Sequence, residues 1–112
     1  MANFYKNAFF DLDTTNVTSL YTCPSNSRAI IQNIQFTNET GTTTVQVYVT
    51  DNSASTTYEI SHASVSANST TNAAKGPVIL EENDILKIQA SSADTVSGIV
   101  SILEISRSDQ NG

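Results

Sequence analysis

Ala29-Ile30-Ile31-Gln32-Asn33-Ile34-Gln35-Phe36-Thr37 is the stretch that decides the fold of this chain. Ile30, Ile34 and Phe36 would lie on one side of an extended backbone, with Asn33, Gln35 and Thr37 on the other. This period of two residues is typical of a β-strand that buries one face. Ile31 and Gln32 interrupt the alternation, which predicts a β-bulge near Ile31.

Short runs of the same kind recur along the rest of the chain. They are separated by Asn, Asp, Ser, Gly and Pro, and no window shows the sustained i, i+3, i+4 apolar spacing of a helix. The expected strands cover residues 4–12, 17–22, 29–37, 45–49, 56–61, 78–80, 85–90 and 99–105. The pattern predicts an all-β fold, an antiparallel β-sandwich of about eight strands that is jelly-roll-like.

The length of 112 residues fits a single domain spanning residues 1–112. Residues 1–12 form an N-terminal aromatic segment, and residues 106–112 are expected to be a frayed tail. Asn38-Glu39-Thr40-Gly41 is expected to join two strands in a hairpin.

Two further segments have a distinctive composition. Residues 64–75 are small and polar, which predicts a weak edge strand around Val65 followed by a long exposed loop. Residues 99–105 are apolar on both faces, which predicts a strand covered on both sides.

The charge excludes one class of partner. The net charge is −6, the pI is about 4.3, and the five basic residues are scattered: Lys6, Arg28, Lys75, Lys87 and Arg107. Binding to nucleic acid needs clustered Lys and Arg, so no nucleic-acid partner is expected. No membrane partner is expected either, because no apolar run approaches the ~20 residues needed to span a bilayer. The N-terminus lacks the pattern of a signal peptide, which indicates synthesis in a cytoplasm.

The residues of catalytic and metal sites are almost absent. There is one cysteine, Cys23, and one histidine, His62, with no catalytic signature around either. Glu81, Glu82, Asn83 and Asp84 crowd oxygen atoms together but lack the alternating ligand spacing of a calcium loop, so a solvated turn is favoured. We therefore expect no catalytic residue, no metal site and no cofactor, and the protein is not expected to be an enzyme.

The aromatic residues near the N-terminus are candidates for an interface. Phe4, Tyr5, Phe9 and Phe10 are too many large aromatics for a loose terminus unless something covers them. They either contact another protein or complete the core of the domain itself, and the sequence does not choose between these alternatives. Tyr5, Tyr48 and Tyr58 are separate candidates for carbohydrate binding, on the analogy of sandwiches with exposed aromatics.

Four blocks of sequence carry a resemblance to a known family: Leu20-Tyr21-Thr22-Cys23-Pro24, then residues 27–34, then Gly76-Pro77-Val78-Ile79-Leu80 continuing through residues 81–90, and finally residues 97–105. Together they resemble small β-sandwich virion proteins of tailed bacteriophages, particularly those of cyanobacterial phages, between Val17 and Ile105. Two positions depart from the family pattern. Cys23 stands where valine is common, and Asn83 stands where glycine is common, although asparagine also accepts the left-handed backbone conformation.

The resemblance implies a structural part of a virus particle, without a choice of place. Family members are capsid decoration or cement proteins, neck or collar parts, and small tail or fibre modules. They commonly act as homo-oligomers such as trimers, and their partners are other virion proteins, among them the major capsid protein. A capsid decoration protein located in the virion is therefore expected, with a neck, collar, tail or fibre component and a lectin-like receptor-binding module as alternatives.

Two residues of these blocks are expected to fix local geometry. Asp84 can accept hydrogen bonds from nearby backbone N–H groups and so fix the entry to the next strand. Arg28 can pair with Asp84, Glu81 or Glu82 if the two blocks lie side by side, and such a pair would fix geometry more than stability.

Overall fold

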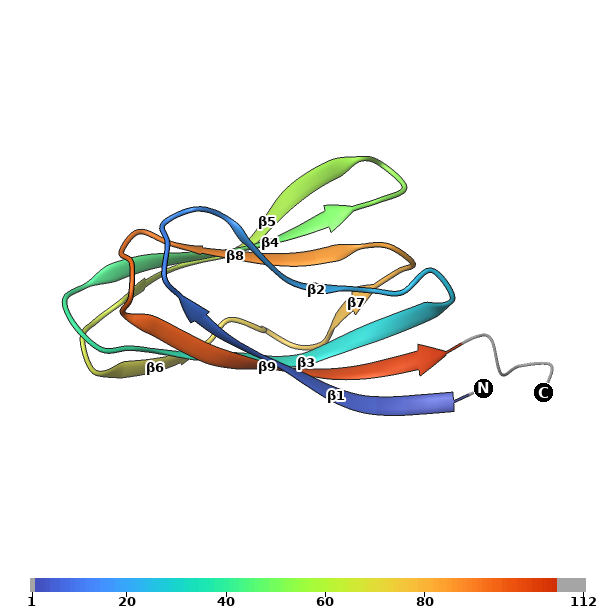
Figure 1. Cartoon of the computed structure of the whole chain (residues 1–112), viewed down its shortest axis with the longest axis horizontal. Helices are drawn as coiled ribbons and strands as arrows, with labels where there is room; N and C mark the ends of the chain where they lie inside the picture. The colour runs from blue at the N-terminus through green and yellow to red at the C-terminus, as the bar shows by residue number, and fades with distance from the viewer. Residues whose placement is uncertain (1, 107–112) are drawn as a thin grey trace.

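The computed structural model describes residues 2–106 and folds them into two packed β-sheets (Figure 1). Its nine strands are β1 (Ala2–Leu12), β2 (Thr18–Thr22), β3 (Ser27–Asn38), β4 (Thr43–Asp51), β5 (Thr56–Val65), β6 (Ser69–Asn72), β7 (Val78–Leu80), β8 (Ile85–Ala90) and β9 (Val96–Ser106). Of the tail expected at residues 106–112, Ser106 is the last residue of β9, and residues 107–112 lie outside the described residues.

The strand order is that of a jelly roll. One sheet has five strands in the order β1-β9-β3-β6, with β7 also paired to β3, and the other has four strands in the order β2-β8-β4-β5. The antiparallel pairs are nested along the chain: β4 with β5, β3 with β6 and β7, β2 with β8, and β1 with β9. Successive pairs alternate between the sheets, which confirms the predicted all-β, jelly-roll-like sandwich.

The bulge predicted near Ile31 is present in β3. The register of β3 against β9 shifts between Ile31 and Asn33. Because of this extra residue, Ile31, Ile34 and Phe36 point into the core, where each is at most 1% exposed. Ile30, which the sequence pattern placed on the buried face, lies instead on the opposite face and is half-buried.

The hairpin predicted at residues 38–41 is wrong. The segment after Asn38 leaves the five-stranded sheet and enters the four-stranded sheet, so β3 and β4 belong to different layers. The Asn38 side chain stabilises this crossing, because its Nδ2 donates to the carbonyl oxygens of Gly41 at 2.6 Å and Val65 at 3.0 Å. The hairpin partner of β4 is β5, and this pair projects from one side of the sandwich (Figure 1).

Residues 64–75 also differ from the expectation of a weak strand and a long loop. Val65 ends β5, a strand of 10 residues, and is 1% exposed. Residues 69–72 then form β6, which pairs with β3 from Gln35 to Asn38. Small hydroxyl side chains have little apolar surface to reveal this strand in the sequence, yet their backbone groups complete the ladder.

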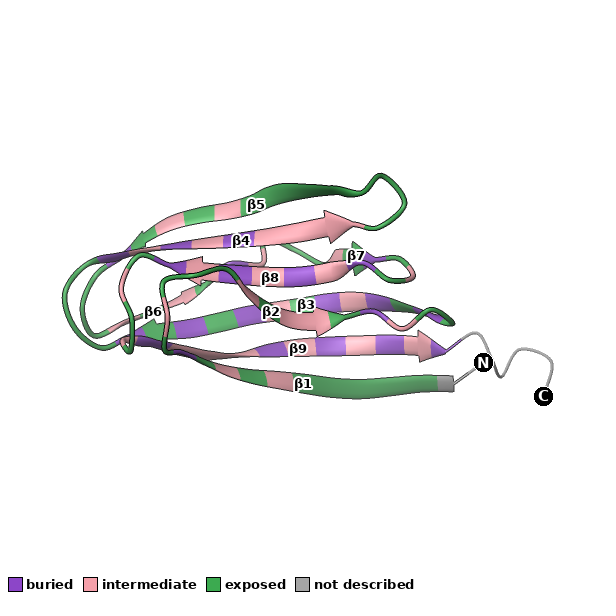
Figure 2. Ribbon diagram, turned by 45° about the horizontal axis from the view of Figure 1, so that its top comes forward, coloured by how far each residue is buried: buried purple, intermediate pink, exposed green. Residues whose placement is uncertain are grey.

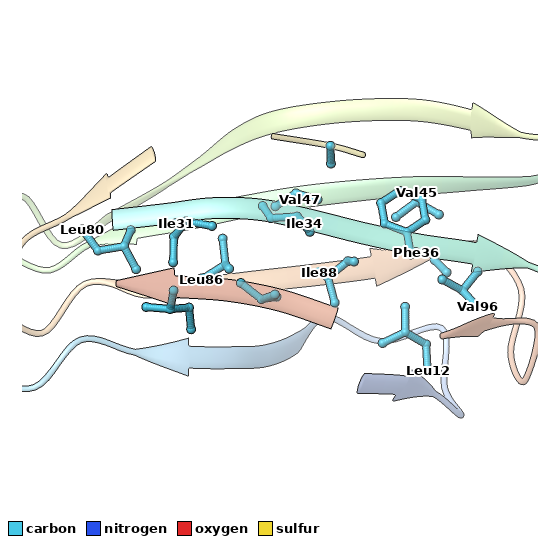
Figure 3. Close-up of a cluster of buried hydrophobic side chains, with 14 of the residues drawn as sticks. Leu12, Ile31, Ile34, Phe36, Val45, Val47, Leu80, Leu86, Ile88 and Val96 are labelled. Carbon is cyan, nitrogen blue, oxygen red and sulfur yellow. The ribbon is translucent and has the colours of Figure 1, made fainter. Parts of the chain in front are cut away.

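The core lies between the inner faces of the two sheets (Figure 3). Alternate residues of β3, β8 and β9 are buried, and the banding along these strands follows this period (Figure 2). The largest fully buried side chains are Phe36, Leu12, Ile31, Ile34, Leu80, Leu86, Ile88, Ile102, Val45, Val47, Val65 and Val96. Burying each such side chain contributes about 1.5–3 kcal/mol, so this layer is the main source of stability.

Gly98 lets an aromatic ring of β1 cross the neighbouring strand. Phe10 lies opposite Gly98 and packs against the core. A Cβ atom on Gly98 would overlap the backbone oxygen of Gln35 and would lie 2.7 Å from Cζ of Phe10. The space above Gly98 is therefore occupied by the Phe10 ring, and this position in the middle of β9 accepts only glycine.

We predict that Gly98→Ala destabilises the protein by about 1–3 kcal/mol, the usual cost of overpacking a core. Alanine at an ordinary strand position would instead stabilise by about 0.5–1 kcal/mol, because glycine weakens strands. The measurement is urea unfolding followed by circular dichroism, with Ser101→Ala in the same strand as the control. An unchanged or raised midpoint for Gly98→Ala would contradict the close packing.

Candidate interaction surface

The face of the five-stranded sheet that points away from the core is the candidate site, and we call it the outer face. The strand registers assign its residues, since directly opposed residues share a face. They are Asn3, Tyr5, Asn7, Phe9 and Asp11 of β1; Ser97, Ile99, Ser101, Leu103 and Ile105 of β9; Arg28, Ile30, Asn33, Gln35 and Thr37 of β3; Thr70 and Asn72 of β6; and Ile79 of β7.

An apolar row crosses the whole outer face. Tyr5 lies opposite Leu103, Leu103 opposite Ile30, and Ile30 opposite Ile79. The two ends of the row are the most exposed, with Tyr5 at 81% and Ile79 at 64%, while Leu103 and Ile30 between them are half-buried by their neighbours. Four large apolar side chains on four strands thus form one continuous band.

A second apolar group lies farther along β1. Phe9, 75% exposed, stands opposite Ile99 and forms one wall of a shallow hollow of about 310 Å³. Gln35, Thr37 and Ser97 supply polar groups around this hollow. Among the described residues, no charged side chain lines the hollow.

Charges on the outer face are confined to its margins. Among the strand residues of this face that the structure describes, only Asp11 and Arg28 are charged, and they lie toward opposite ends of the sheet. Charge depletion at the centre together with enrichment in aromatic residues is the compositional signature of protein–protein interfaces.

The corresponding face of the four-stranded sheet has a different character. Its polar side chains bind one another: Tyr48 Oη donates to Gln89 Oε1 at 3.0 Å, and Gln46 Nε2 donates to Glu59 Oε2 at 2.7 Å. This contrast within one molecule makes the outer face of the five-stranded sheet the better candidate for an interface.

Of the four aromatic residues singled out near the N-terminus, one packs on the core and three lie exposed. Phe4, Tyr5 and Phe9 are 46%, 81% and 75% exposed, whereas Phe10 is half-buried and packs on the core. Phe4 and Phe10 point to the inner side of β1, and Tyr5 and Phe9 point to the outer face. Figure 2 shows most of β1 as exposed.

Sequence reasoning missed four residues of the surface: Ile30, Ile79, Ile99 and Leu103. For Ile99 and Leu103 the sequence does carry a signal, because residues 99–105 are apolar on both faces. That pattern predicts a strand covered on both sides, which hides these two residues as surface candidates. β9 is enclosed laterally by β1 and β3, and its inner residues Val96, Val100 and Ile102 are buried. Among the described residues, no second layer covers its outer residues.

Arg28 and Asp84 have separate roles in the structure. Arg28 Nε lies 3.2 Å from Glu82 Oε1, and Arg28 Nη1 lies 3.8 Å from Glu81 Oε2. Asp84, 6% exposed, accepts hydrogen bonds from the backbone N–H groups of Glu81 and Asn52, each at 2.9 Å. The two blocks of sequence therefore do lie side by side, with Glu82 and Glu81 as the ion-pair partners and Asp84 as an acceptor for backbone groups.

Asn83 has a φ of 68°, the left-handed conformation that asparagine accepts.

A buried carboxylate ties β1 to the rest of the sandwich. Glu104 on β9 is 5% exposed, and it accepts a hydrogen bond from Tyr21 Oη at 2.5 Å across the gap between the sheets. Lys6 Nζ on β1 lies 2.9 Å from the other carboxylate oxygen. The network closes one end of the core and anchors the N-terminal half of β1, which positions Tyr5 on the outer face.

The pKa of Glu104 reflects these contacts. Burial raises the pKa of the carboxyl group, but the hydrogen bonds from Tyr21 and Lys6 outweigh burial, and the pKa is lowered overall. The pKa of Tyr21 changes in the opposite direction: burial raises it, and the Glu104 carboxylate raises it further. A lowered pKa means that the ionised carboxylate is bound more favourably in the folded than in the unfolded protein.

We therefore predict that Glu104 contributes stability that is fully present above about pH 4.3, the usual pKa of glutamate, and is lost as the pH falls through its lower folded pKa. Glu104→Gln should cost about 1–3 kcal/mol at pH 7, because it weakens a buried hydrogen-bonded pair, and should flatten the acid limb of the stability curve. Thermal unfolding of both proteins between pH 3 and pH 7 tests this, with Glu39→Gln, at an exposed position after β3, as the control. If the stability of the wild type and that of Glu104→Gln fell in parallel as the pH is lowered, the role of the Glu104 carboxylate would be contradicted.

Cys23 and His62 occupy different environments. Cys23 is fully buried, and its Sγ donates to the carbonyl oxygen of Ser27 at 3.3 Å. Burial raises the pKa of the thiol, and the Glu104 and Asp84 carboxylates raise it further. His62 lies exposed on β5, where Nδ1 is 3.2 Å from Glu59 Oε2. Neither environment activates a nucleophile, because a reactive thiol needs a lowered pKa and access to solvent.

We predict that Cys23 does not react with Ellman's reagent at pH 8 while the protein is folded, and reacts stoichiometrically in urea. The expected difference in rate is at least 100-fold, since reaction requires opening of the fold. A prompt reaction of the folded protein would contradict the buried, protonated thiol.

The described residues can also be compared with the requirements of a metal site, a membrane span and a carbohydrate site. Within residues 2–106, no three His, Cys, Asp or Glu side chains gather in a way that could hold a metal ion. Over the same residues, no helix has the length and apolar character to span a membrane. The tyrosines considered for carbohydrate binding lie apart: Tyr5 is on the five-stranded sheet, whereas Tyr48 and Tyr58 are on β4 and β5 of the other sheet.

The sequence matches no protein-family model and no curated protein. Solved structures with a similar fold include a chain in the acid-stable capsid of Helicobacter pylori bacteriophage KHP30, with a TM-score of 0.60, 18% identity, and coverage of 96% of this chain and 90% of that one. A chain of the T13 particle of infectious bursal disease virus has a TM-score of 0.59 at 8% identity, and the match covers 91% of this chain and only 30% of the viral one.

The fold is also found outside viruses. A chain of the Bacillus endospore appendages, which are disulfide-linked pili, has a TM-score of 0.57 at 11% identity, with coverage of 93% of this chain and 88% of that one. At these identities the similarity is one of fold: the chain is built like jelly-roll chains found in viral and phage capsids.

Proposed function

We propose that this protein is a structural component of a bacteriophage virion, a capsid decoration or cement protein that stabilises the shell by self-association and by packing on the major capsid protein. The observation that carries the proposal is the outer face, with its apolar row of Tyr5, Leu103, Ile30 and Ile79 and its charges at the margins. A surface of this kind is expected to be covered in the working assembly.

The size of the outer face supports a stable contact. β9 contributes 11 residues, which at about 3.4 Å per residue give a length of about 37 Å. Four strands about 4.8 Å apart give a width of about 19 Å. The resulting footprint of about 700 Å² is close to the ~800 Å² that each partner buries in a standard protein–protein interface.

Two further observations favour a capsid over an assembly like the Bacillus appendages. The resemblance in sequence is to tailed-phage virion proteins. The Bacillus appendages are disulfide-linked, whereas the single cysteine of this chain is buried and hydrogen-bonded. The proposed mechanism is burial of shape-matched surfaces, with no bond-making step.

The place in the particle is tested by cryo-electron microscopy of virions of the phage that encodes this chain. A decoration protein occupies capsomers over the whole head in hundreds of copies. A neck or tail component occurs in multiples of three, six or twelve on one axis, and would replace the decoration role while leaving the virion role intact. Absence from purified particles would contradict both.

We predict that Ile79→Lys lowers the affinity for phage heads at least tenfold, because it places a charge at the exposed end of the apolar row. The matched control is Ser64→Lys, which adds the same charge to β5 of the other sheet, where residue 64 is exposed. Both variants should retain the native circular dichroism spectrum and melting temperature. Co-sedimentation with heads depleted of this protein measures the binding, and equal loss in both variants would contradict the outer face as the contact.

A further inference from the structure

β1 is an edge strand with an unoccupied side. It is the last strand of the five-stranded sheet, paired with β9 over all 11 of its residues, and within the described residues no strand pairs with its other side. An edge strand of this length exposes a row of backbone N–H and C=O groups, which form a template for another strand. The aromatic side chains beside this edge add apolar surface to the backbone template.

The sequence of β1 is symmetric about Asn7. Counting outward from Asn7, aromatic residues stand two and three positions away on both sides: Tyr5 and Phe4 toward the N-terminus, and Phe9 and Phe10 toward the C-terminus. An antiparallel pairing of two identical strands about a two-fold axis brings residues at equal distances from the axis opposite each other. With the axis at Asn7, each Tyr5 faces a Phe9, and each Phe4 faces a Phe10.

From this symmetry we infer that β1 pairs with β1 of a second copy of this chain, antiparallel and with Asn7 opposite Asn7. Tyr5 and Phe9 both lie on the outer face, so they meet on that face. Phe4 stands opposite Phe10 on the inner side, where the Phe10 ring already lies over Gly98 of its own chain, so the Tyr5–Phe9 pairs carry the contact. Aromatic pairs directly opposed on neighbouring strands are among the stabilising cross-strand pairs of a sheet. The two five-stranded sheets become one continuous sheet, with a continuous outer face.

The neighbouring registers are less favourable. A shift of two residues one way places Lys6 opposite Lys6, and a shift the other way places Asp11 opposite Tyr5. Neither shift opposes two aromatic residues. A shift by one residue turns the second copy over, because side chains alternate between the faces of a strand. Among the registers that keep the outer faces together, only the one centred on Asn7 opposes two pairs of aromatic residues on the outer face, Tyr5 with Phe9 twice.

The charges of β1 are compatible with this register. The inner-side Lys6 lies opposite the small Ala8, and its ammonium group is already paired with Glu104 at 2.9 Å. Asp11 lies opposite the neutral Asn3. No like charges are opposed along the seam, so the repulsion that protects many edge strands from pairing is absent.

The inference concerns the isolated chain and holds whether or not the protein belongs to a virion. A two-fold contact joins copies in even numbers, whereas the family resemblance implies a trimer. The two are compatible only if a further contact closes a three-fold ring, and sedimentation of the purified protein separates the cases. A monomer, or a trimer without further association, at 100 μM would overturn the pairing.

The register is tested by cross-linking. Asn7→Cys in a Cys23→Ser background places two thiols at the two-fold axis, where opposed Cα atoms lie about 4.5–5.5 Å apart. That separation suits a disulfide. Mild oxidation with diamide should convert most of this variant to a covalent dimer. In the control, Asn3→Cys with Cys23→Ser, the two thiols would lie about 27 Å apart, eight residues along the strand, and should remain monomeric on a denaturing gel. Equal cross-linking of both variants, or none with Asn7→Cys, would overturn the register.

Charge substitutions distinguish edge pairing from stacking of two outer faces. Asn7→Lys opposes two lysines at the axis and should weaken dimerisation at least tenfold, while Ile79→Lys, at the far side of the sheet, should leave it unchanged. The reverse result would show face-to-face stacking and contradict the proposal. Phe9→Lys serves as a second edge variant if Asn7→Lys fails to fold, as judged by circular dichroism.

Discussion

The double pairing of β9 is the constraint on which the rest of the structure depends. β9 pairs with β1 over the whole length of that strand and with β3 on its other side. Its even-numbered residues Val96, Val100 and Ile102 supply the core, and its odd-numbered residues Ile99 and Leu103 supply the centre of the outer face. One strand thus connects the stability of the domain to its candidate binding surface.

The constraint acts at two points along β1. At Gly98 the absence of a side chain admits the Phe10 ring, which holds the C-terminal half of β1 on the core. At Glu104 a buried carboxylate binds Lys6 and the Tyr21 hydroxyl, which holds the N-terminal half. Tyr5 and Phe9 lie next to these anchors, point outward and stay 81% and 75% exposed, on a strand that is paired along its whole length with β9.

Rigidity of this kind suits assembly. Ordering a flexible segment costs conformational entropy at the moment of binding, whereas a strand already paired along one edge has lost that entropy on folding. β1 offers two separate surfaces to other molecules: the outer face, for a partner that covers apolar side chains, and the free edge, for a strand that completes the ladder. The same 11 residues can therefore serve the contact proposed for the outer face and the pairing inferred with a second copy.

Local pattern was sufficient for the fold class, for most strands and for the bulge near Ile31, because these depend on neighbours in the chain. It also drew attention to Phe4, Tyr5, Phe9 and Phe10, but it could not show that Phe10 packs on the core while the other three stay exposed. Residues 38–41 look like a hairpin by the same local pattern, but whether a turn joins two strands of one sheet or crosses between sheets depends on which strand comes to pair with β3.

The interaction surface required the tertiary structure for the same reason. Tyr5, Ile30, Ile79 and Leu103 are distant in the chain, and only the registers of β1, β3, β7 and β9 place them in one row. The residue types and their alternation determined that this chain forms β-strands and has one cysteine and one histidine, because both are local properties of the sequence. Which apolar residues are left uncovered was decided by strand pairing over long separations, since burial is a property of the packed layers.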